Sequence, residues 1–254
     1  MDFGDPQARA AFFSVYEAIP RQGPGSRAST ARALSCISGL PMSPRVLDLG
    51  AGCGRQTLDL AALLPGATIR AVEAHAPFVD QLTEALTAQG LTDRISASQG
   101  DMGALPEAPG SVDLIWSEGA AYFLGIEAAL AKWVPLLRPG GALALTEAVW
   151  LVEDPPTEAR AFWAEEYPAL RPVSVLVERF AAAGLSVVGS FALPAEDWWA
   201  DFYTPMLARL DVLEAGDCSP TEQAVYAEIR GEIEIHRRLG HTYGYAFCVG
   251  QRPA

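Results

Sequence analysis

The sequence predicts an α/β protein with a Rossmann-like, doubly wound sheet. From residue 45 to residue 150, short apolar segments alternate with helical segments. The first apolar segment runs directly into a glycine-rich turn, VLDLGAGCG at residues 46–54, and a helical segment follows it. A segment of strand composition, YGYAFCVGQ, closes the chain. Strands joined by right-handed helical crossovers form a parallel sheet with helices on both faces.

The first 43 residues are expected to form a helical N-terminal cap. A helical pattern at residues 8–19 ends at RQGPGS, residues 21–26, because Gly-Pro-Gly cannot continue a helix. Ser26 is suited to cap a second helix, which we expect to run to residue 37.

The core is expected at residues 44–150, where strand and helix alternate regularly. Its expected strands are residues 46–49, 68–72, 95–98, 112–116 and 142–148, and its expected helices are residues 56–64, 77–89 and 126–137. This regular alternation predicts a parallel sheet whose strands all end at the same edge.

Residues 151–254 are expected to add cap helices over the substrate and the last two strands to the same domain. The expected helices are residues 158–167, 174–183 and one long helical stretch at 197–239, and the expected strands are residues 185–193 and 243–251. We therefore expect a single domain over residues 1–254.

Composition excludes several classes of protein. Charged residues make up 19% of the chain and hydrophobic residues 50%, which excludes a wholly disordered chain. The formal net charge of -13 would repel a phosphate backbone, so we expect no nucleic-acid partner. No apolar run approaches a membrane span, and the N-terminus does not resemble a signal peptide. We expect a cytoplasmic protein that makes no contact with a membrane.

Cysteine and histidine give no sign of a metal site. The four cysteines are widely separated, with no CxxC pair and no histidine at zinc spacing. We expect buried free thiols and no metal.

The glycine-rich turn raises the question of its ligand. Its spacing, Gly50, Gly52 and Gly54, is GxGxG, whereas dinucleotide-binding turns favour GxGxxG. No GK[ST] follows, which excludes a triphosphate P-loop. A plain tight turn is the competing interpretation, although the strand before the turn and the helix after it favour a ligand site.

Acidic residues follow the second and third strands. Glu73 is placed to accept hydrogen bonds from ribose hydroxyls, and it would repel a 2′-phosphate, which disfavours NADP. Asp101 and Met102 follow the third strand, where a carboxylate and a main-chain N–H suit an adenine ring. Each acid alone is typical of a solvated loop, but their common position at the carboxyl ends of strands indicates a binding edge.

Together these motifs resemble the class I S-adenosylmethionine-dependent methyltransferases. They are VLDLGAGCG, Glu73 in VEAH, the Asp101-Met102 pair, VDLIWSEGAAYFLG at residues 112–125 and LRPGGALALTE at residues 137–147. RQGPGS and FWAEEYP further resemble a bacterial small-molecule subgroup of the methyltransferase type 11/25 kind.

The resemblance implies a seven-stranded sheet of order 3-2-1-4-5-7-6 with the last strand antiparallel. It also implies S-adenosyl-L-methionine as the cofactor, a ligand without phosphate, and Asp48 is suited to its ammonium group. The implied cofactor-binding residues are Arg21, Gly23, Asp48, Gly50, Ala51, Gly52, Glu73, Ala74, Asp101, Met102, Ser117 and Glu118.

Methyl transfer from a sulfonium is an in-line displacement, so positioning of the acceptor is the first requirement. A general base is needed only where the acceptor carries a proton at working pH. The candidate catalytic residues are Glu118, Tyr122, Glu147 and His241. Competing interpretations are a helix-N-terminal acid for Glu118 and a structural hydrogen bond for Glu147. Of the other histidines, we expect His75 to be solvent-exposed, with a position at the border of the adenine as the alternative, and His236 to lie on a helix surface.

The RQGPGS segment and the aromatic residues outside the core suggest how the cleft is closed. We expect Arg21 and Gln22 to fold over the cleft and to meet a carboxylate of the cofactor or substrate, with a plain helix–helix turn as the alternative. Aromatic residues at positions 162–203 suggest a partly apolar chamber, as well as packing of the cap.

The expected function is methyl transfer to an O, N, S or C atom of a small organic acceptor. The alternatives are aminopropyl transfer, a non-catalytic S-adenosylmethionine-binding protein and an NAD-dependent oxidoreductase. The oligomeric state is open between a monomer and a homodimer.

Overall fold

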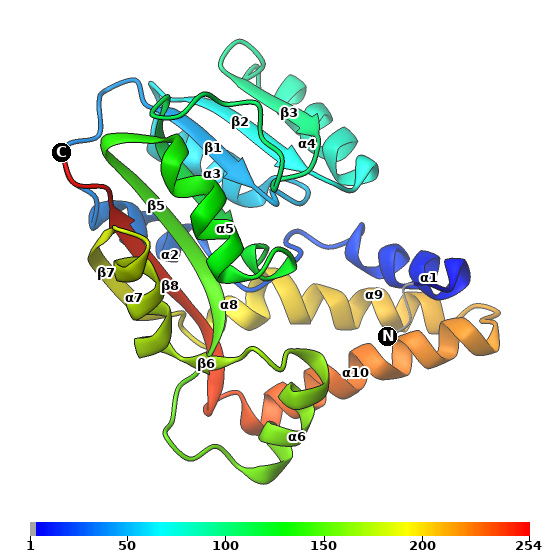
Figure 1. The fold of residues 1–254 in the computed structure, drawn as a ribbon. Helices are drawn as coiled ribbons and strands as arrows, with labels where there is room; N and C mark the ends of the chain where they lie inside the picture. The colour runs from blue at the N-terminus through cyan, green and yellow to red at the C-terminus, as the bar shows by residue number, and fades with distance from the viewer. Residues whose placement is uncertain (1–3) are drawn as a thin grey trace.

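The computed structural model describes residues 4–254 and confirms the predicted fold class. The strands form one sheet in the order β3-β2-β1-β4-β5-β8-β7, and the two-residue β6 pairs with β5 (Figure 1). Only β8 runs antiparallel to its neighbours among the described strands. The strands are β1 (Arg45–Leu49), β2 (Thr68–Glu73), β3 (Ile95–Gln99), β4 (Val112–Glu118), β5 (Leu137–Trp150), β6 (Arg171–Pro172), β7 (Ser186–Ala192) and β8 (Tyr243–Gln251). Apart from β6, this is the order that the resemblance implies.

Helices cover both faces of the sheet and extend beyond its edge. They are α1 (Pro6–Tyr16), α2 (Arg27–Ser35), α3 (Arg55–Leu63), α4 (Ala76–Ala88), α5 (Ile126–Trp133), α6 (Thr157–Glu166), α7 (Val173–Ala182), α8 (Glu196–Trp198), α9 (Thr204–Glu214) and α10 (Pro220–Leu239). Two 3₁₀ turns, η1 (Ala121–Phe123) and η2 (Val134–Leu136), flank α5, and a π-helical segment, η3 (Trp199–Tyr203), joins α8 to α9. Ser26 caps α2 as expected, because its side chain accepts a hydrogen bond from the Ser29 N–H.

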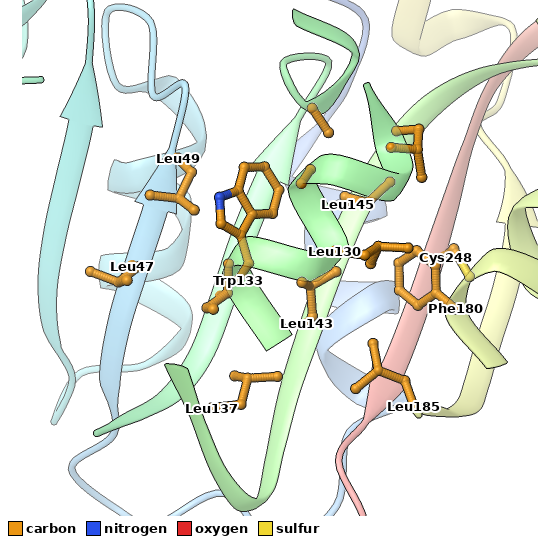
Figure 2. Packing of buried hydrophobic residues seen from close by; sticks show 14 of the residues in the cluster. Leu47, Leu49, Leu130, Trp133, Leu137, Leu143, Leu145, Phe180, Leu185 and Cys248 are labelled. Carbon is orange, nitrogen blue, oxygen red and sulfur yellow. The ribbon is translucent and has the colours of Figure 1, made fainter. Parts of the chain in front are cut away.

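Alternation along β5 builds a core on each face of the sheet. Leu143 and Leu145 face α5 and α7, and Figure 2 shows Trp133 of α5 and Phe180 of α7 on this side. Ala142 and Ala144, on the opposite face, belong to the core that α2, α3 and α4 cover. The period of two residues in a strand produces this division. Each fully buried leucine contributes about 1.5–3 kcal/mol of stability.

A helical lobe lies beside the sheet. Helices α1, α9 and α10 pack against one another, next to α8 (Figure 1). Their shared core contains Val15, Met206 and Ile229. The long α10 begins at a capping box, in which Ser219 and Glu222 bond to each other's backbone. The lobe therefore has its own apolar core and meets the sheet at the edge where the candidate site lies.

The structure corrects three expectations about the elements. The stretch expected to be helical at residues 197–239 breaks at residues 215–219, where Gly216 and Pro220 disfavour continuation. The RPGG segment, expected as a turn before the fifth strand, lies inside β5, where the register with β4 shifts. The short β6 was not predicted, because two residues carry no periodic pattern.

Candidate active site

Three other segments of the chain pack closely against the glycine-rich turn between β1 and α3. They contain Gln22, Leu82 and Ala120. Gly50, Gly52 and Gly54 have φ of +71°, +54° and +88°, which side chains rarely adopt. A Cβ at Gly50 would lie 2.2 Å from the Cβ of Ala120, and one at Gly54 would lie 2.1 Å from a methyl group of Leu82. Only glycine fits these positions, so the turn is a tightly enclosed cradle.

Glu73, at the end of β2, holds the turn through its carboxylate. The Gly52 N–H donates to one carboxylate oxygen and the His75 N–H to the other, each at 2.9 Å. Glu73 is partly exposed, so each oxygen keeps a lone pair for a further donor. A pair of ribose hydroxyls is such a donor, as the sequence predicts.

Asp48, on β1 beneath the turn, is fully buried and only partly satisfied. The Thr57 hydroxyl donates to one carboxyl oxygen, and the other has no hydrogen-bond partner among the described residues. Burial raises the pKa of Asp48 to about 7. A buried oxygen without a donor suits a positively charged group more than a phosphate.

The segment after β3 places Asp101 and Met102 near the turn. Asp101 is exposed, and one of its carboxylate oxygens accepts a 2.7 Å hydrogen bond from the Gly103 N–H. The sulfur of Met102 lies 3.9 Å from the position that a Cβ on Gly50 would take. Ala74, also exposed, follows Glu73 at the same edge. The structure therefore brings the predicted adenine-side residues to one edge of the sheet.

The RQGPGS segment folds over the glycine-rich turn. Gln22 accepts a 2.9 Å hydrogen bond from the Cys53 N–H and donates to the carbonyls of Tyr16 and Ile19. Its Oε1 lies 2.4 Å from the position of a Cβ on Gly52. Gly23 has open space around its α-carbon. The segment thus ties α1 to the cradle.

Arg21 is buried in this segment and bridges two carboxylates. One guanidinium nitrogen donates to Glu118 at 3.0 Å and another donates to Asp59 at 2.6 Å. The arginine side chain is 3% exposed, and its Nε lies 3.9 Å from a carboxylate oxygen of Asp201, beyond hydrogen-bond distance. No local sequence pattern indicates Asp59, because its side chain meets Arg21 only in the folded chain.

Glu118, at the end of β4, is held by several donors. Besides Arg21, it accepts hydrogen bonds from the Trp116 indole N–H and the Thr30 hydroxyl. Burial raises the pKa of Glu118, and the Arg21 charge opposes that rise. A carboxylate with this many donors is suited to holding the RQGPGS segment in place. Ser117 beside it donates to the Leu49 carbonyl at 2.9 Å and is buried.

Tyrosines from distant elements gather where β4 and β5 end and β8 begins. Tyr245 of β8 lies against Gly119, with its Cε2 3.0 Å from the position of a Cβ there. The rings of Tyr122 and Tyr167 lie edge to face, with centroids 5.9 Å apart. Burial raises the pKa of all four phenols of Tyr16, Tyr122, Tyr167 and Tyr245, yet each side chain keeps some exposed surface. The four tyrosines are therefore partly exposed members of one aromatic cluster.

Two carboxyl groups face these tyrosines. Glu147 of β5 is 4% exposed, and neither carboxyl oxygen has a hydrogen-bond partner of good geometry among the described residues. Glu232 of α10 accepts a 2.8 Å hydrogen bond from the Tyr203 hydroxyl. Burial raises the pKa of each carboxyl to about 7. We use the name tyrosine chamber for Tyr16, Tyr122, Tyr167 and Tyr245 with Glu147 and Glu232.

The histidines differ from what the sequence predicts. His75, expected to be exposed, stacks on Phe13 with centroids 3.7 Å apart and bonds to Glu17 at 2.7 Å. His236, expected on a helix surface, is buried against Trp198, and burial lowers its pKa to about 4. His241 is exposed in the turn before β8. Its role as a catalytic base stays a prediction.

An open groove of about 500 Å³ lies between α1 and the segment after β2. It is lined by Phe13, Ser14, Glu17 and His75, among others. Apart from His75, the lining residues come from α1 and the residues that flank it.

Metal and membrane features are not found in the part of the chain that the structure describes. Within residues 4–254, no three His, Cys, Asp or Glu side chains stand close enough to hold a metal ion. No described helix combines the length and the apolar character needed to cross a bilayer. The four cysteines are free, but only Cys248 is fully buried, which corrects the expectation of four buried thiols.

The cradle fits S-adenosylmethionine on this structure's own evidence. The glycines leave no room for side chains, Glu73 keeps acceptors for a ribose, and Asp48 presents a buried oxygen without a donor. Sequence reasoning found these residues because each follows a strand end. It missed Tyr16, Tyr245, Glu232, Asp59 and Thr30, which come from helices and a late strand and meet the site only in three dimensions. The tyrosines of YGYAFCVGQ, near the end of the chain, were the one available signal.

Comparison with known proteins agrees with this site. Residues 46–141 match the family model described as a methyltransferase domain. Methyltransferase GfsG of Streptomyces halstedii is 31% identical over 106 residues, which are 41% of this chain and 38% of that protein. The match spans 38–51% of the length of the first three curated relatives.

Solved structures share the fold over nearly the whole chain. A methyltransferase from Geobacter sulfurreducens, solved with S-adenosyl-L-homocysteine, has a TM-score of 0.80 and 20% identity, covering 96% of this chain and 98% of that one. The [4+2]-cyclase SpnF has a TM-score of 0.77 and 18% identity, covering 98% and 93%. At such identities the likeness establishes the fold alone.

Proposed function

Since the chain belongs to the S-adenosylmethionine-dependent methyltransferases, with the methyltransferase domain at residues 46–141, we propose that it transfers a methyl group to a small organic acceptor. The observation that carries this proposal is the junction at Gly119. There, the segment after β4 meets Tyr245 of the tyrosine chamber, while the next residue, Ala120, lies against Gly50 of the cradle. One short segment therefore connects the cofactor cradle to the chamber.

The cradle residues would hold the cofactor by matched chemistry. Glu73 would accept from the ribose hydroxyls, and Asp101 with Met102 would border the adenine. Asp48 suits the ammonium group of the methionine end, and the Nε of Arg21, which makes no hydrogen bond, suits its carboxylate. The other predicted members, at the turn and after β4, are Gly23, Gly50, Ala51, Gly52, Ala74, Ser117 and Glu118. When bound, the cofactor supplies a sulfonium-activated methyl group.

The protein's own contribution would be positioning and exclusion of water. The RQGPGS segment closes over the turn, and α1 and α10 bring Tyr16 and Glu232 to the chamber. Enclosure of this kind favours a small acceptor that enters the chamber over a macromolecule that lies on a surface. The net charge of -13 also disfavours nucleic acid as the acceptor.

The test uses S-adenosylmethionine carrying a labelled methyl group. The protein is incubated with pooled small-molecule fractions and, separately, with tRNA and total protein, and label is followed into each. Label in a small molecule, with release of S-adenosylhomocysteine, is the expected result. Label that enters only macromolecules would contradict the proposal.

A second candidate is a protein that holds the cofactor without transferring its methyl group. The solved structure of SpnF, which shares the fold, is described as a [4+2]-cyclase. Binding of S-adenosylmethionine with no release of S-adenosylhomocysteine from any fraction would favour this candidate.

A further inference from the structure

We propose that the acceptor is an amine, bound as a cation in the tyrosine chamber by the carboxylates of Glu147 and Glu232 and by the tyrosine rings. This inference rests on the methyl transfer proposed above and narrows its substrate class. Four features support it. Glu147 and Glu232 form no ion pair with a basic side chain, and the nearby arginines have other partners. Tyrosine rings surround the two carboxyls, and Glu147 can accept the proton that an amine must lose.

Glu147 is a buried carboxyl without a charged partner. Both of its oxygens are shielded from solvent and have no hydrogen-bond partner of good geometry among the described residues. The Tyr167 phenol and the Ala148 N–H are near enough to favour the ionised form, but neither donor carries a charge. An isolated carboxylate at such a site is costly unless a cation or several donors accompany it. The chamber is therefore built around a charge whose partner comes from outside.

The arginines near these carboxyls are engaged by other groups. Arg171, which lines a small cavity beside Glu147, donates hydrogen bonds to the carbonyls of Pro168 and Leu170. Arg179 attracts Glu147 weakly, but its side chain forms a 2.8 Å ion pair with Glu127. Arg238 pairs with Glu158 at 2.7 Å, and Arg21 is held by Glu118 and Asp59. Within residues 4–254, no ion pair of Glu147 or Glu232 with a basic side chain is found.

The field around Glu232 is negative as well. Glu166 and Glu228 both act to raise the pKa of Glu232, as like charges do. An anionic acceptor would add to this repulsion, and a neutral alcohol would leave the carboxyls without a counter-charge. A cationic acceptor meets both requirements.

The tyrosine rings provide faces that favour a cation. Besides burial, the charge of Glu232 raises the pKa of Tyr16, Tyr122 and Tyr245, and the charge of Glu147 raises the pKa of the last two. Aromatic faces attract ammonium groups, by about 2 kcal/mol where the site is desolvated. No hydrogen bond to these three phenol groups is found among the described residues, so their oxygens can accept N–H donors. Carboxylates and rings together form a site for ammonium.

Glu147 also has the right chemistry for the proton that an amine must lose. An ammonium group has no lone pair, so a proton must pass from nitrogen to the Glu147 carboxylate before nitrogen can react. The nitrogen lone pair then forms the C–N bond as the S–CH₃ bond breaks, and that electron pair stays on sulfur. Glu147 finally releases its proton to solvent. Because burial holds the pKa of Glu147 near 7, both steps are accessible at neutral pH.

The test compares probes that share a skeleton and differ in charge. Benzylamine, benzyltrimethylammonium, benzyl alcohol and benzoate are titrated by calorimetry into protein saturated with S-adenosylhomocysteine, and the ethyl series is titrated in parallel. We expect the two cations of a series to bind at least about tenfold more tightly than its alcohol and acid. Equal or tighter binding of alcohol or acid, or no cation binding up to millimolar concentration in either series, would overturn the inference.

Variants then locate the site and separate this inference from the proposed function. Glu147→Gln, which keeps the shape and removes the charge, should weaken cation binding about tenfold and leave S-adenosylhomocysteine binding unchanged. Glu84→Gln, on the exposed face of α4, is the matched control and should change neither. Equal cation binding by both variants would refute the role of Glu147. Failure of the unmodified protein to bind S-adenosylhomocysteine would instead refute the proposed function. Transfer of the labelled methyl group to alcohols alone would refute only the inference that the acceptor is an amine.

Discussion

Replacing Arg21 by methionine tests the junction between the RQGPGS segment and the cradle. The change removes one guanidinium and leaves Glu118 and Asp59 buried, with side-chain exposures of 5% and 9%. Removing one partner of a buried ion pair costs about 3–5 kcal/mol, because the remaining charge is uncompensated. For a chain of 254 residues, each kcal/mol lowers the melting temperature by about 2–4 °C. We therefore expect a loss of roughly 6–20 °C.

The matched control is Arg160→Met, in an ion pair on the surface. Arg160 donates to Asp154 at 2.8 Å, but the two side chains are 51% and 90% exposed. Such pairs contribute about 0.2–1 kcal/mol. Urea denaturation of both variants gives the free energies of unfolding. Equal losses in the two variants would refute the argument that the Arg21 bridge is a buried one.

The loss of unfolding free energy in Arg21→Met should also depend on pH. Burial raises the pKa of Glu118, and Arg21 opposes the rise, so the variant's Glu118 has a still higher pKa. A carboxyl whose pKa is higher in the folded state stabilises that state at pH values below its unfolded-state pKa. This stabilisation is lost as pH rises through the folded-state pKa. The deficit of Arg21→Met should therefore shrink between pH 8 and pH 5. A deficit that grows toward pH 5 would contradict this reasoning.

Three further predictions concern the cradle and the chamber. Gly54→Ala should destabilise the protein by more than about 2 kcal/mol in urea denaturation, because the added Cβ would lie 2.1 Å from Leu82. Gly90→Ala is the control: its φ is +64° and its surroundings are open, so it should destabilise the protein by only about 1 kcal/mol. Equal destabilisation by the two variants would contradict the packing argument. Glu73→Ala should weaken S-adenosylhomocysteine binding about 10–100-fold by calorimetry, and an unchanged affinity would remove Glu73 from the ribose site. The unfolding free energy of the unmodified protein should include a contribution from Glu147 that is lost as pH rises through about 7, because burial raises the folded pKa of Glu147 above its ordinary value, against the opposing effects of Tyr167 and Arg179. Glu147→Gln should remove that contribution, and an identical pH dependence in both proteins would refute it.

Periodicity and turn chemistry predicted much of the fold. The expected strand at residues 243–251 coincides with β8, and Ser26 caps α2 as its residue type predicts. The edges of β5 were missed, because a glycine-rich segment with a shifted register does not show strand periodicity. Local patterns thus located elements well and irregular strand ends poorly.

The site was predictable where it follows the sheet and unpredictable where it does not. Gly50, Glu73 and Asp101 follow consecutive strands, so topology alone places them at one edge. The pairing of Arg21 with Asp59 joins residues 38 apart, and Glu232 reaches the chamber from α10. Such contacts depend on how the lobe packs, which no local pattern encodes.

The most direct test of the central claim is the ligand dependence of thermal unfolding. The purified protein is melted with S-adenosylmethionine, S-adenosylhomocysteine, NAD or NADP, each in excess. A ligand that binds only the folded state raises the melting temperature by mass action. The account predicts a rise with the first two and none with the nicotinamide cofactors. A rise with NAD alone would mean that the glycine-rich turn holds a dinucleotide, and it would contradict the account.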